Sequence, residues 1–118
     1  MNAPTKPAAF PLSRFRAHHG TVWISGQVPV RGSDPIPEAF EAQARLTLEN
    51  VRAALEAAGS SMDRVLKVNC FLRREADMAA FNGVYREFFR EPFPARTTLV
   101  AAPPNPKFLI EIEAVAAL

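Results

Sequence analysis

The chain has 118 residues, 48% of them hydrophobic, and a net charge of +2, which indicates one domain over residues 1–118 with a modest core. Its fourteen lysines and arginines are scattered, so no basic run indicates a nucleic-acid partner. One cysteine excludes an internal disulfide, and no apolar run is long enough for a signal peptide or a membrane span. We therefore expect a soluble, cytoplasmic protein.

The first part of the chain predicts a loose arm followed by two strands. Residues 1–9 include two prolines and little to bury, which is typical of a flexible terminus. Residues 10–17 are weakly strand-like, and His18-His19-Gly20 is typical of a turn. The β-branched and aromatic run TVWIS at residues 21–25 predicts a strand, and residues 28–37 form a loop rich in proline.

The middle of the chain predicts helix, strand, helix. From about residue 36, apolar side chains recur at helical spacing, with Pro37 in the first turn and Gly59 as the stop. Residues 64–73 alternate as a strand, and residues 75–90 return to helical spacing. The expected apolar face of that strand comprises Leu66, Val68, Cys70 and Leu72. The expected stripe of the second helix comprises Met78, Phe81, Val84 or Tyr85, and Phe88.

The last segment, residues 93–115, predicts two strands joined by the turn Pro103-Pro104-Asn105-Pro106. Side chains alternate along a strand, so Arg96 and Thr98 share one face of the first strand, and Glu111 and Glu113 share one face of the second. If the two strands pair about the turn, Arg96 and Thr98 lie roughly opposite Glu113 and Glu111. A guanidinium beside carboxylates on one sheet face indicates an anion site.

The resulting order, β-β-α-β-α-β-β, predicts a two-layer α+β domain with a mixed sheet and both helices on one face. The uncovered face is expected to bear Arg96, Glu111, Glu113 and Val115. Because that face mixes apolar and charged side chains, we expect subunits to pack against it and leave charged clefts.

Several short pieces, in this order, resemble the RidA/YjgF family of reactive-intermediate (enamine/imine) deaminases. They are Ile24-Ser25-Gly26-Gln27-Val28-Pro29, Gln43-Ala44, Leu48-Glu49-Asn50-Val51, Ala57-Ala58-Gly59-Ser60, Phe81-Asn82-Gly83-Val84-Tyr85, Phe88-Phe89, Phe93-Pro94-Ala95-Arg96 and Ile110-Glu111-Ile112-Glu113-Ala114. The resemblance spans residues 13–118. It implies a chorismate-mutase-like fold, a homotrimer with active sites in the subunit clefts, and hydrolysis of 2-enamine or 2-imine acids to 2-keto acids and ammonia. It implies no cofactor and no metal.

The residues fit that chemistry. Arg96 can hold a substrate carboxylate bidentately, and Glu111 can orient and deprotonate a water molecule. The resemblance adds the backbone at Thr98 and the side chain of Asn82 as substrate contacts, and Ser25 is a further candidate. Taken alone, an arginine at a strand start such as Arg96 is more typical of a surface ion pair than of a catalytic residue, and Glu113 is interpreted as structural or interfacial.

Other candidate residues favour structural roles. His18 and His19 are interpreted as exposed turn residues because neighbouring histidines on a strand point apart and no third metal ligand is suitably spaced. Cys70 lies on an apolar strand face, so we interpret it as a buried core thiol. Gly26 is interpreted as a residue that permits close backbone approach.

The chain departs from the family pattern at two positions. Phe10-Pro11-Leu12 stands where many members have a Gly-Pro-Tyr piece, and Thr98 stands where a cysteine is common. Both changes bear on substrate range. Two alternatives to the deaminase stay open: a module that binds small keto acids or other carboxylates without turnover, and an RNA-cleaving relative, for which a basic patch with exposed aromatic side chains would be expected.

Overall fold

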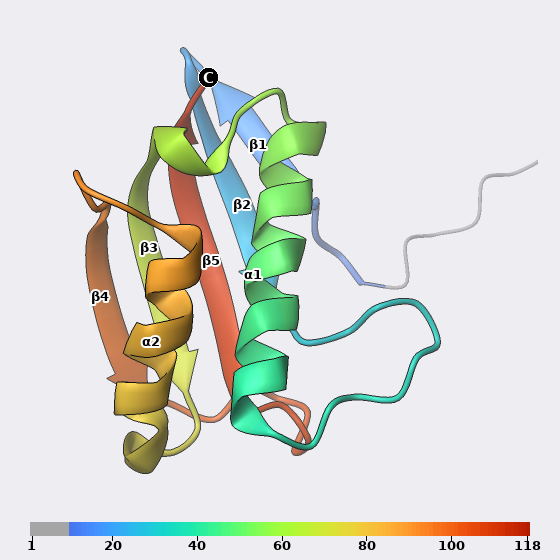
Figure 1. Cartoon of the computed structure of the whole chain (residues 1–118). Helices are drawn as coiled ribbons and strands as arrows, with labels where there is room; N and C mark the ends of the chain where they lie inside the picture. The colour runs from blue at the N-terminus through green and yellow to red at the C-terminus, as the bar shows by residue number, and fades with distance from the viewer. Residues whose placement is uncertain (1–9) are drawn as a thin grey trace, which may run out of the picture.

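The computed structural model describes residues 10–118, and the predicted arm of residues 1–9 lies outside them. Five strands form one sheet in the order β1-β2-β5-β3-β4 (Figure 1). Their bounds are Phe15–His18 for β1, Thr21–Gln27 for β2, Val65–Leu72 for β3, Ala95–Val100 for β4 and Ile110–Ala117 for β5. Only β3 and β4 are parallel, and the other neighbours are antiparallel, so the predicted mixed sheet is confirmed.

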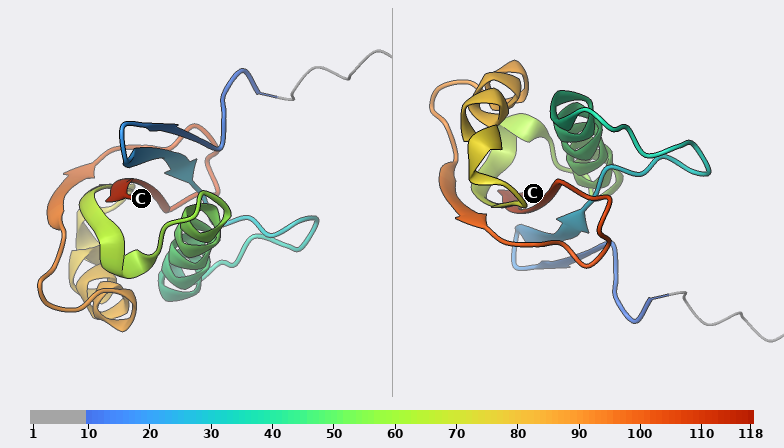
Figure 2. Two further views of the ribbon diagram at one scale, coloured as in Figure 1. Left: turned by 90° about the horizontal axis from the view of Figure 1, so that it is seen from above. Right: turned by 90° about the horizontal axis from the view of Figure 1, so that it is seen from below.

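Two helices cover one face of this sheet, which curves around them in the end-on views of Figure 2. They are α1 at Phe40–Ala57 and α2 at Met78–Phe88, and short 3₁₀ turns precede β3 and α2. The predicted order of elements and the two-layer α+β class are confirmed. α1 starts three residues after Pro37, which stays in the loop and accepts a hydrogen bond from the Gln43 side chain. Gly59 follows the helix with φ +88°, so the predicted stop is confirmed.

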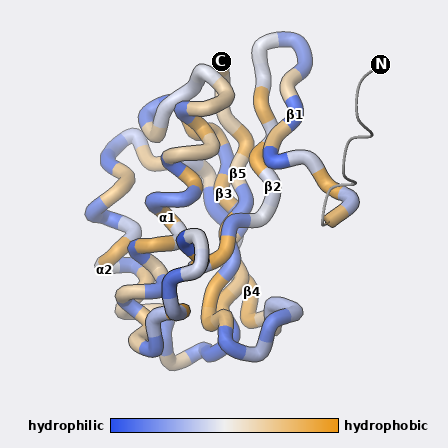
Figure 3. Tube along the Cα trace, turned by 90° about the vertical axis from the view of Figure 1, so that its right-hand side faces the viewer, coloured by the Kyte–Doolittle hydropathy of each residue, from blue (hydrophilic) through white to orange (hydrophobic). Residues whose placement is uncertain are grey.

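The core lies between the helices and the inner face of the sheet. It is lined from the strands by Val22, Ile24, Val68, Cys70, Leu72, Ile110, Ile112 and Ala114, and from the helices by Ala44, Leu48, Val51, Leu55, Phe81, Val84 and Tyr85. Burial raises the pKa of the Cys70 thiol to about 12, as expected for an inert core residue. The alternation of hydrophobic and hydrophilic residues along the strands is visible in Figure 3.

One position of the predicted core is wrong. Leu66 is 54% exposed, whereas Val65 beside it is 7% exposed. The pairing of β3 with β5 shifts between Val65 and Lys67, so a β-bulge turns both Val65 and Val68 toward the helices. A single extra residue in a strand reverses the parity of everything before it, and this reversal has no signal in the alternation pattern.

The predicted pairing of the last two strands is also wrong. β4 and β5 do not pair, because β3 lies between them and binds both. The proline-rich segment between β4 and β5 is therefore a crossover past the end of β3. Arg73, just after β3, fixes this crossover by donating to the backbone carbonyls of Pro103, Asn105 and Phe108 at 2.7–2.9 Å.

Candidate functional site

Arg96 lies on the inner, helix-facing side of the edge strand β4. It pairs in register with the buried Val68, and its guanidinium carbon lies 4.7 Å from the ring centroid of Tyr85 and 5.4 Å from that of Phe81. Within residues 10–118, Arg96 has no ion pair and no side-chain hydrogen bond, although it is only partly exposed. A half-buried guanidinium on an aromatic surface, without a carboxylate partner, is suited to bind an anion.

Asn82 of α2 joins Arg96 in one small pocket of about 230 Å³. Tyr85, Arg86, Phe93 and Pro94 complete its walls. Tyr85 contributes its ring face to the pocket, while its hydroxyl is buried without a partner. Burial raises the pKa of Tyr85 above its ordinary value, so the hydroxyl stays protonated. The structure thus brings together two of the predicted site residues, Arg96 and Asn82.

Thr98 lies two residues further along β4, also on the inner side. It pairs with Cys70, and its hydroxyl oxygen is buried without a hydrogen-bond partner. Its side chain therefore lies in the core, and only its backbone is near solvent, because β4 is an edge strand. The expected substrate contact through the Thr98 backbone stays a prediction.

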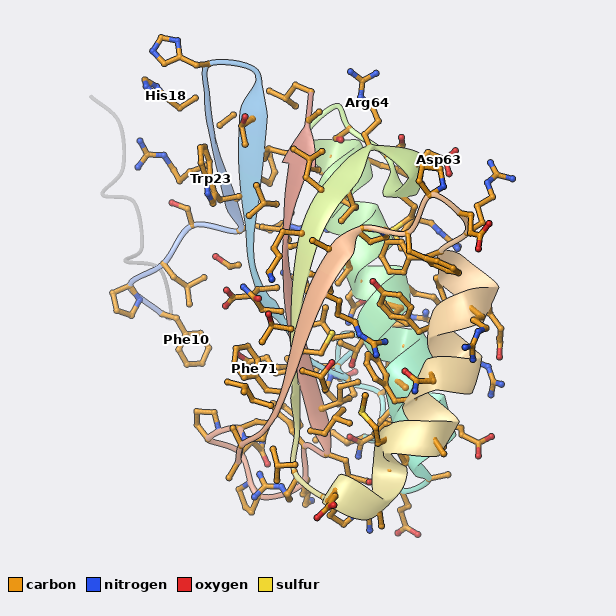
Figure 4. All side chains as sticks on the ribbon, turned by 90° about the vertical axis from the view of Figure 1, so that its left-hand side faces the viewer. Phe10, His18, Trp23, Asp63, Arg64 and Phe71 are labelled. Atoms are coloured by element: carbon orange, nitrogen blue, oxygen red, sulfur yellow. The ribbon has the colours of Figure 1, made fainter. Side chains whose placement is uncertain are left out.

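Glu111 lies on the outer face of the sheet, where it pairs with Phe71, while its neighbours Ile110 and Ile112 are fully buried on the inner face. Figure 4 shows Phe71 and Trp23 on this side, away from the helices. Glu111 lines a hollow of about 170 Å³ with Phe71, Glu113 and the first residues of the crossover. Burial raises the pKa of the Glu111 carboxyl above its ordinary value, and the charge of Glu113 raises it further.

Gly26 of β2 lies directly against the Glu111 carboxylate. A Cβ atom at position 26 would lie 2.5 Å from Oε2 of Glu111, closer than real contacts allow. The register of β2 against β5 shifts between Ile24 and Gln27, so a bulge places Gly26 here. The interpretation of Gly26 as a residue of close approach is confirmed, and the group that approaches it is the Glu111 side chain.

The expectation that Arg96 and Glu111 share a face is wrong. Parity was predicted correctly within each strand, but the faces of two strands can be compared only through their pairing. Across β3, Arg96 matches the inward Val68 and Glu111 matches the outward Phe71. One chain therefore holds the guanidinium and the carboxylate in two separate pockets on opposite sides of the sheet.

The Ser25 side chain is engaged with the segment that precedes β1. Its hydroxyl donates to the backbone carbonyl of Ser13 at 2.5 Å. The segment that this hydrogen bond fixes includes Leu12, which stands where the family often has tyrosine. Together with Trp23 and Glu113, the segment lines an open hollow of about 610 Å³. Ser25 thus lies on the same outer face as Glu111, one residue from Gly26.

Three further observations concern metal ligands, membrane helices and the two histidines. Across residues 10–118, no three His, Cys, Asp or Glu side chains gather as a metal site would require. The part of the chain that the structure describes contains no helix long and apolar enough to cross a membrane. His18 and His19 are exposed at the β1–β2 turn, as expected.

Comparison with known proteins gives one family model and relatives that match nearly the whole chain. The family model described as Endoribonuclease L-PSP matches residues 2–118. The mitochondrial protein mmf2 of Schizosaccharomyces pombe is 44% identical and is aligned over 99% of this chain and 95% of its own length. The 2-iminobutanoate/2-iminopropanoate deaminase of Dermatophagoides farinae is 37% identical, over 98% of this chain and 92% of its own. Because one relative is mitochondrial, the cytoplasmic localisation stays a prediction.

Solved structures agree with the fold. The crystal structure of TdcF from Escherichia coli, with bound serine, superposes with a TM-score of 0.86 at 36% identity, covering 94% of this chain and 91% of that one. The likeness extends over nearly the whole chain, so TdcF shares its overall architecture.

Proposed function

Because this chain belongs to the Endoribonuclease L-PSP family, the YjgF/RidA family, we propose that it hydrolyses reactive 2-enamine and 2-imine acids to 2-keto acids and ammonia. The observation that carries the proposal is the Arg96 pocket. It offers a partly buried guanidinium with no ion pair in residues 10–118, a stacking surface and the Asn82 amide. A small 2-imino acid presents a carboxylate that fits such a guanidinium bidentately.

The second half of the proposed site comes from another copy of the chain. Arg96 and Glu111 lie on opposite faces of one sheet, so a small molecule cannot touch both within one subunit. We place Arg96, Asn82 and the Thr98 backbone of one subunit against Glu111 of the next, in a homotrimer with a site at each interface. The outer face supports such packing, because Trp23 and Leu99 on it are 47% and 53% exposed.

The proposed chemistry needs no covalent intermediate. Arg96 holds the substrate carboxylate, which fixes the neighbouring C=N carbon beside Glu111 of the adjoining subunit. A water molecule attacks that carbon while the Glu111 carboxylate takes one of its protons and passes it to the imine nitrogen, which gives a carbinolamine. Glu111 then carries the proton of the new hydroxyl group to the nitrogen, and the C–N bond breaks with its electron pair going to nitrogen. The products are a keto acid and ammonia. A carboxyl whose pKa is raised is well suited to both proton transfers.

A coupled assay tests the function. A dehydratase that releases 2-aminoacrylate is mixed with the protein, and keto acid formation is followed against the slow spontaneous hydrolysis. We expect the intact protein to accelerate keto acid release. Binding of a keto acid without acceleration would favour the carboxylate-binding module instead, and RNA cleavage that persists in Arg96→Ala would favour the RNA-cleaving alternative.

Substituting Gly26→Ala should separate catalysis from folding. The new Cβ would lie 2.5 Å from the Glu111 carboxylate, which is the far end of a flexible side chain and would turn away. A displacement of about 1 Å can cost roughly 100-fold in rate, so we expect kcat to fall by at least tenfold while the melting temperature changes little. The matched control is Gly83→Ala on α2, where a Cβ meets nothing within 4 Å. Unchanged kcat in Gly26→Ala would contradict the role of Glu111.

A further inference from the structure

Two carboxylates occupy the outer face of β5 in unlike surroundings. Glu113 pairs in register with Asn69, whose side-chain amide donates to Oε2 of Glu113 at 3.1 Å. Glu111 has no side-chain hydrogen-bond donor within residues 10–118 and packs against the bare backbone at Gly26. Both carboxylates line the same hollow. When neighbouring carboxyl groups differ in this way, one tends to stay charged and the other becomes the proton carrier.

We propose that Glu113, held by the Asn69 amide, is a positioning residue that sets how readily Glu111 takes up and returns a proton during imine hydrolysis. The inference rests on the proposed function and extends it, because the sequence pattern alone indicates only a structural or interfacial role for Glu113. Glu113 need not touch the substrate to act in this way. It acts through its charge, two residues and about 7 Å along the strand from Glu111.

The direction of the effect follows from the surroundings. The Asn69 amide holds the Glu113 carboxylate on the face that it shares with Glu111. Burial raises the pKa of the Glu111 carboxyl, and the charge of Glu113 raises it further. A base with a raised pKa near the working pH transfers protons more effectively than an ordinary surface glutamate.

Other charges face this part of the sheet. By register, Arg16 and His18 of β1 and Lys67 of β3 point to the outer face, and β2 contributes none between Thr21 and Gln27. Lys67 donates to the Thr97 hydroxyl at 2.8 Å, and Arg16 lines the larger hollow beside Glu113. In the proposed trimer, Arg96 of the adjoining subunit would also approach Glu111. A cation that comes close to Glu111 in the assembled protein would oppose the influence of Glu113, so the variant must be compared in the same assembled protein.

The test is the pH profile of kcat in Glu113→Gln. Glutamine keeps the shape and can still accept from Asn69, but it carries no charge. We expect the acid limb of the profile, where Glu111 must be ionised, to move to lower pH by about half a unit or more. The matched control, Glu56→Gln on the exposed side of α1, should leave the limb in place.

A second readout does not depend on turnover. The Glu111 carboxyl is titrated by carbon-13 NMR in the wild type and in Glu113→Gln, with Glu111→Gln used to assign its signal. A downward shift of the titration midpoint in Glu113→Gln supports the inference even if the protein proves not to be a deaminase. An unmoved midpoint overturns it even if deaminase activity is confirmed.

Discussion

Replacing Arg96 with alanine is expected to lower kcat/KM for imine hydrolysis by at least about 100-fold. A charge-assisted, bidentate contact contributes roughly 3 kcal/mol or more, and each 1.4 kcal/mol corresponds to tenfold. No other cation within residues 10–118 lines the same pocket except Arg86, which lies one turn further along α2 from Asn82. We expect a higher KM as well as a lower kcat, because the contact between the Arg96 guanidinium and the substrate carboxylate both binds and orients the substrate.

Two further variants test whether the loss of activity is specific to the bidentate contact of Arg96. Arg96→Lys keeps the charge but cannot form two parallel N–H contacts, so we expect an intermediate loss. Arg52→Ala removes another arginine that lies over a ring, 4.9 Å from the centroid of Phe88, but on α1 and away from the pocket. Arg52→Ala should retain activity. If Arg96→Ala stayed within about twofold of the wild type, the pocket would not be the carboxylate site.

Glu111→Gln is expected to lower kcat by about 100-fold to 10,000-fold with little change in KM, which is the range for loss of a general base. The amide keeps the size and most contacts of the carboxylate beside Gly26, so folding should be preserved. Steady-state kinetics with the coupled dehydratase assay gives both constants.

The control for Glu111→Gln is Glu49→Gln, since Glu49 on α1 pairs with Arg31 at the surface and lies outside the site. Its kcat should match the wild type. A raised KM with unchanged kcat in Glu111→Gln would mean that Glu111 binds the substrate and does not transfer protons. That outcome would leave the Arg96 pocket intact and overturn the mechanism.

Much of the fold follows from local patterns. Helical spacing predicts α1 and α2, and alternation predicts the inward residues of β5 and those of β3 from Val68 onward, because a period of 3.6 or 2 directly reflects which side chains avoid water. Gly59 ends α1 because its φ of +88° suits glycine, and that signal is local too. Such features depend only on near neighbours in the chain.

The predicted pairing of the last two strands is the main error in the predicted fold. Residues 93–115 predict a hairpin, yet β4 pairs with β3, which precedes it by a whole helix. A signal was present: α2 connects β3 to β4, and a strand–helix–strand segment commonly forms a parallel pair. Applying that rule places β4 beside β3 and moves Arg96 to the inner face. The bulge at Val65 carries no comparable signal, whereas a glycine inside a strand, such as Gly26, is itself typical of a bulge or of close backbone approach.

The consequence for the site is large. From the sequence, Arg96 and Glu111 form one cluster on one sheet face, whereas in the structure they line separate pockets on opposite faces of the sheet. The family resemblance already implies sites in the subunit clefts, and the strand order adds the reason why the proposed site takes Arg96 and Glu111 from different chains.

The central claim is therefore that Arg96 of one subunit acts with Glu111 of another, and mixing two inactive variants tests it. Arg96→Ala and Glu111→Gln are unfolded together in equal amounts and refolded. If each site takes one residue from each of two subunits, about one quarter of the sites in the mixture contain both intact residues, and activity should return to about one quarter of the wild type. A mixture that stays as inactive as either variant alone would show that both residues act within one chain or that neither site half is correct.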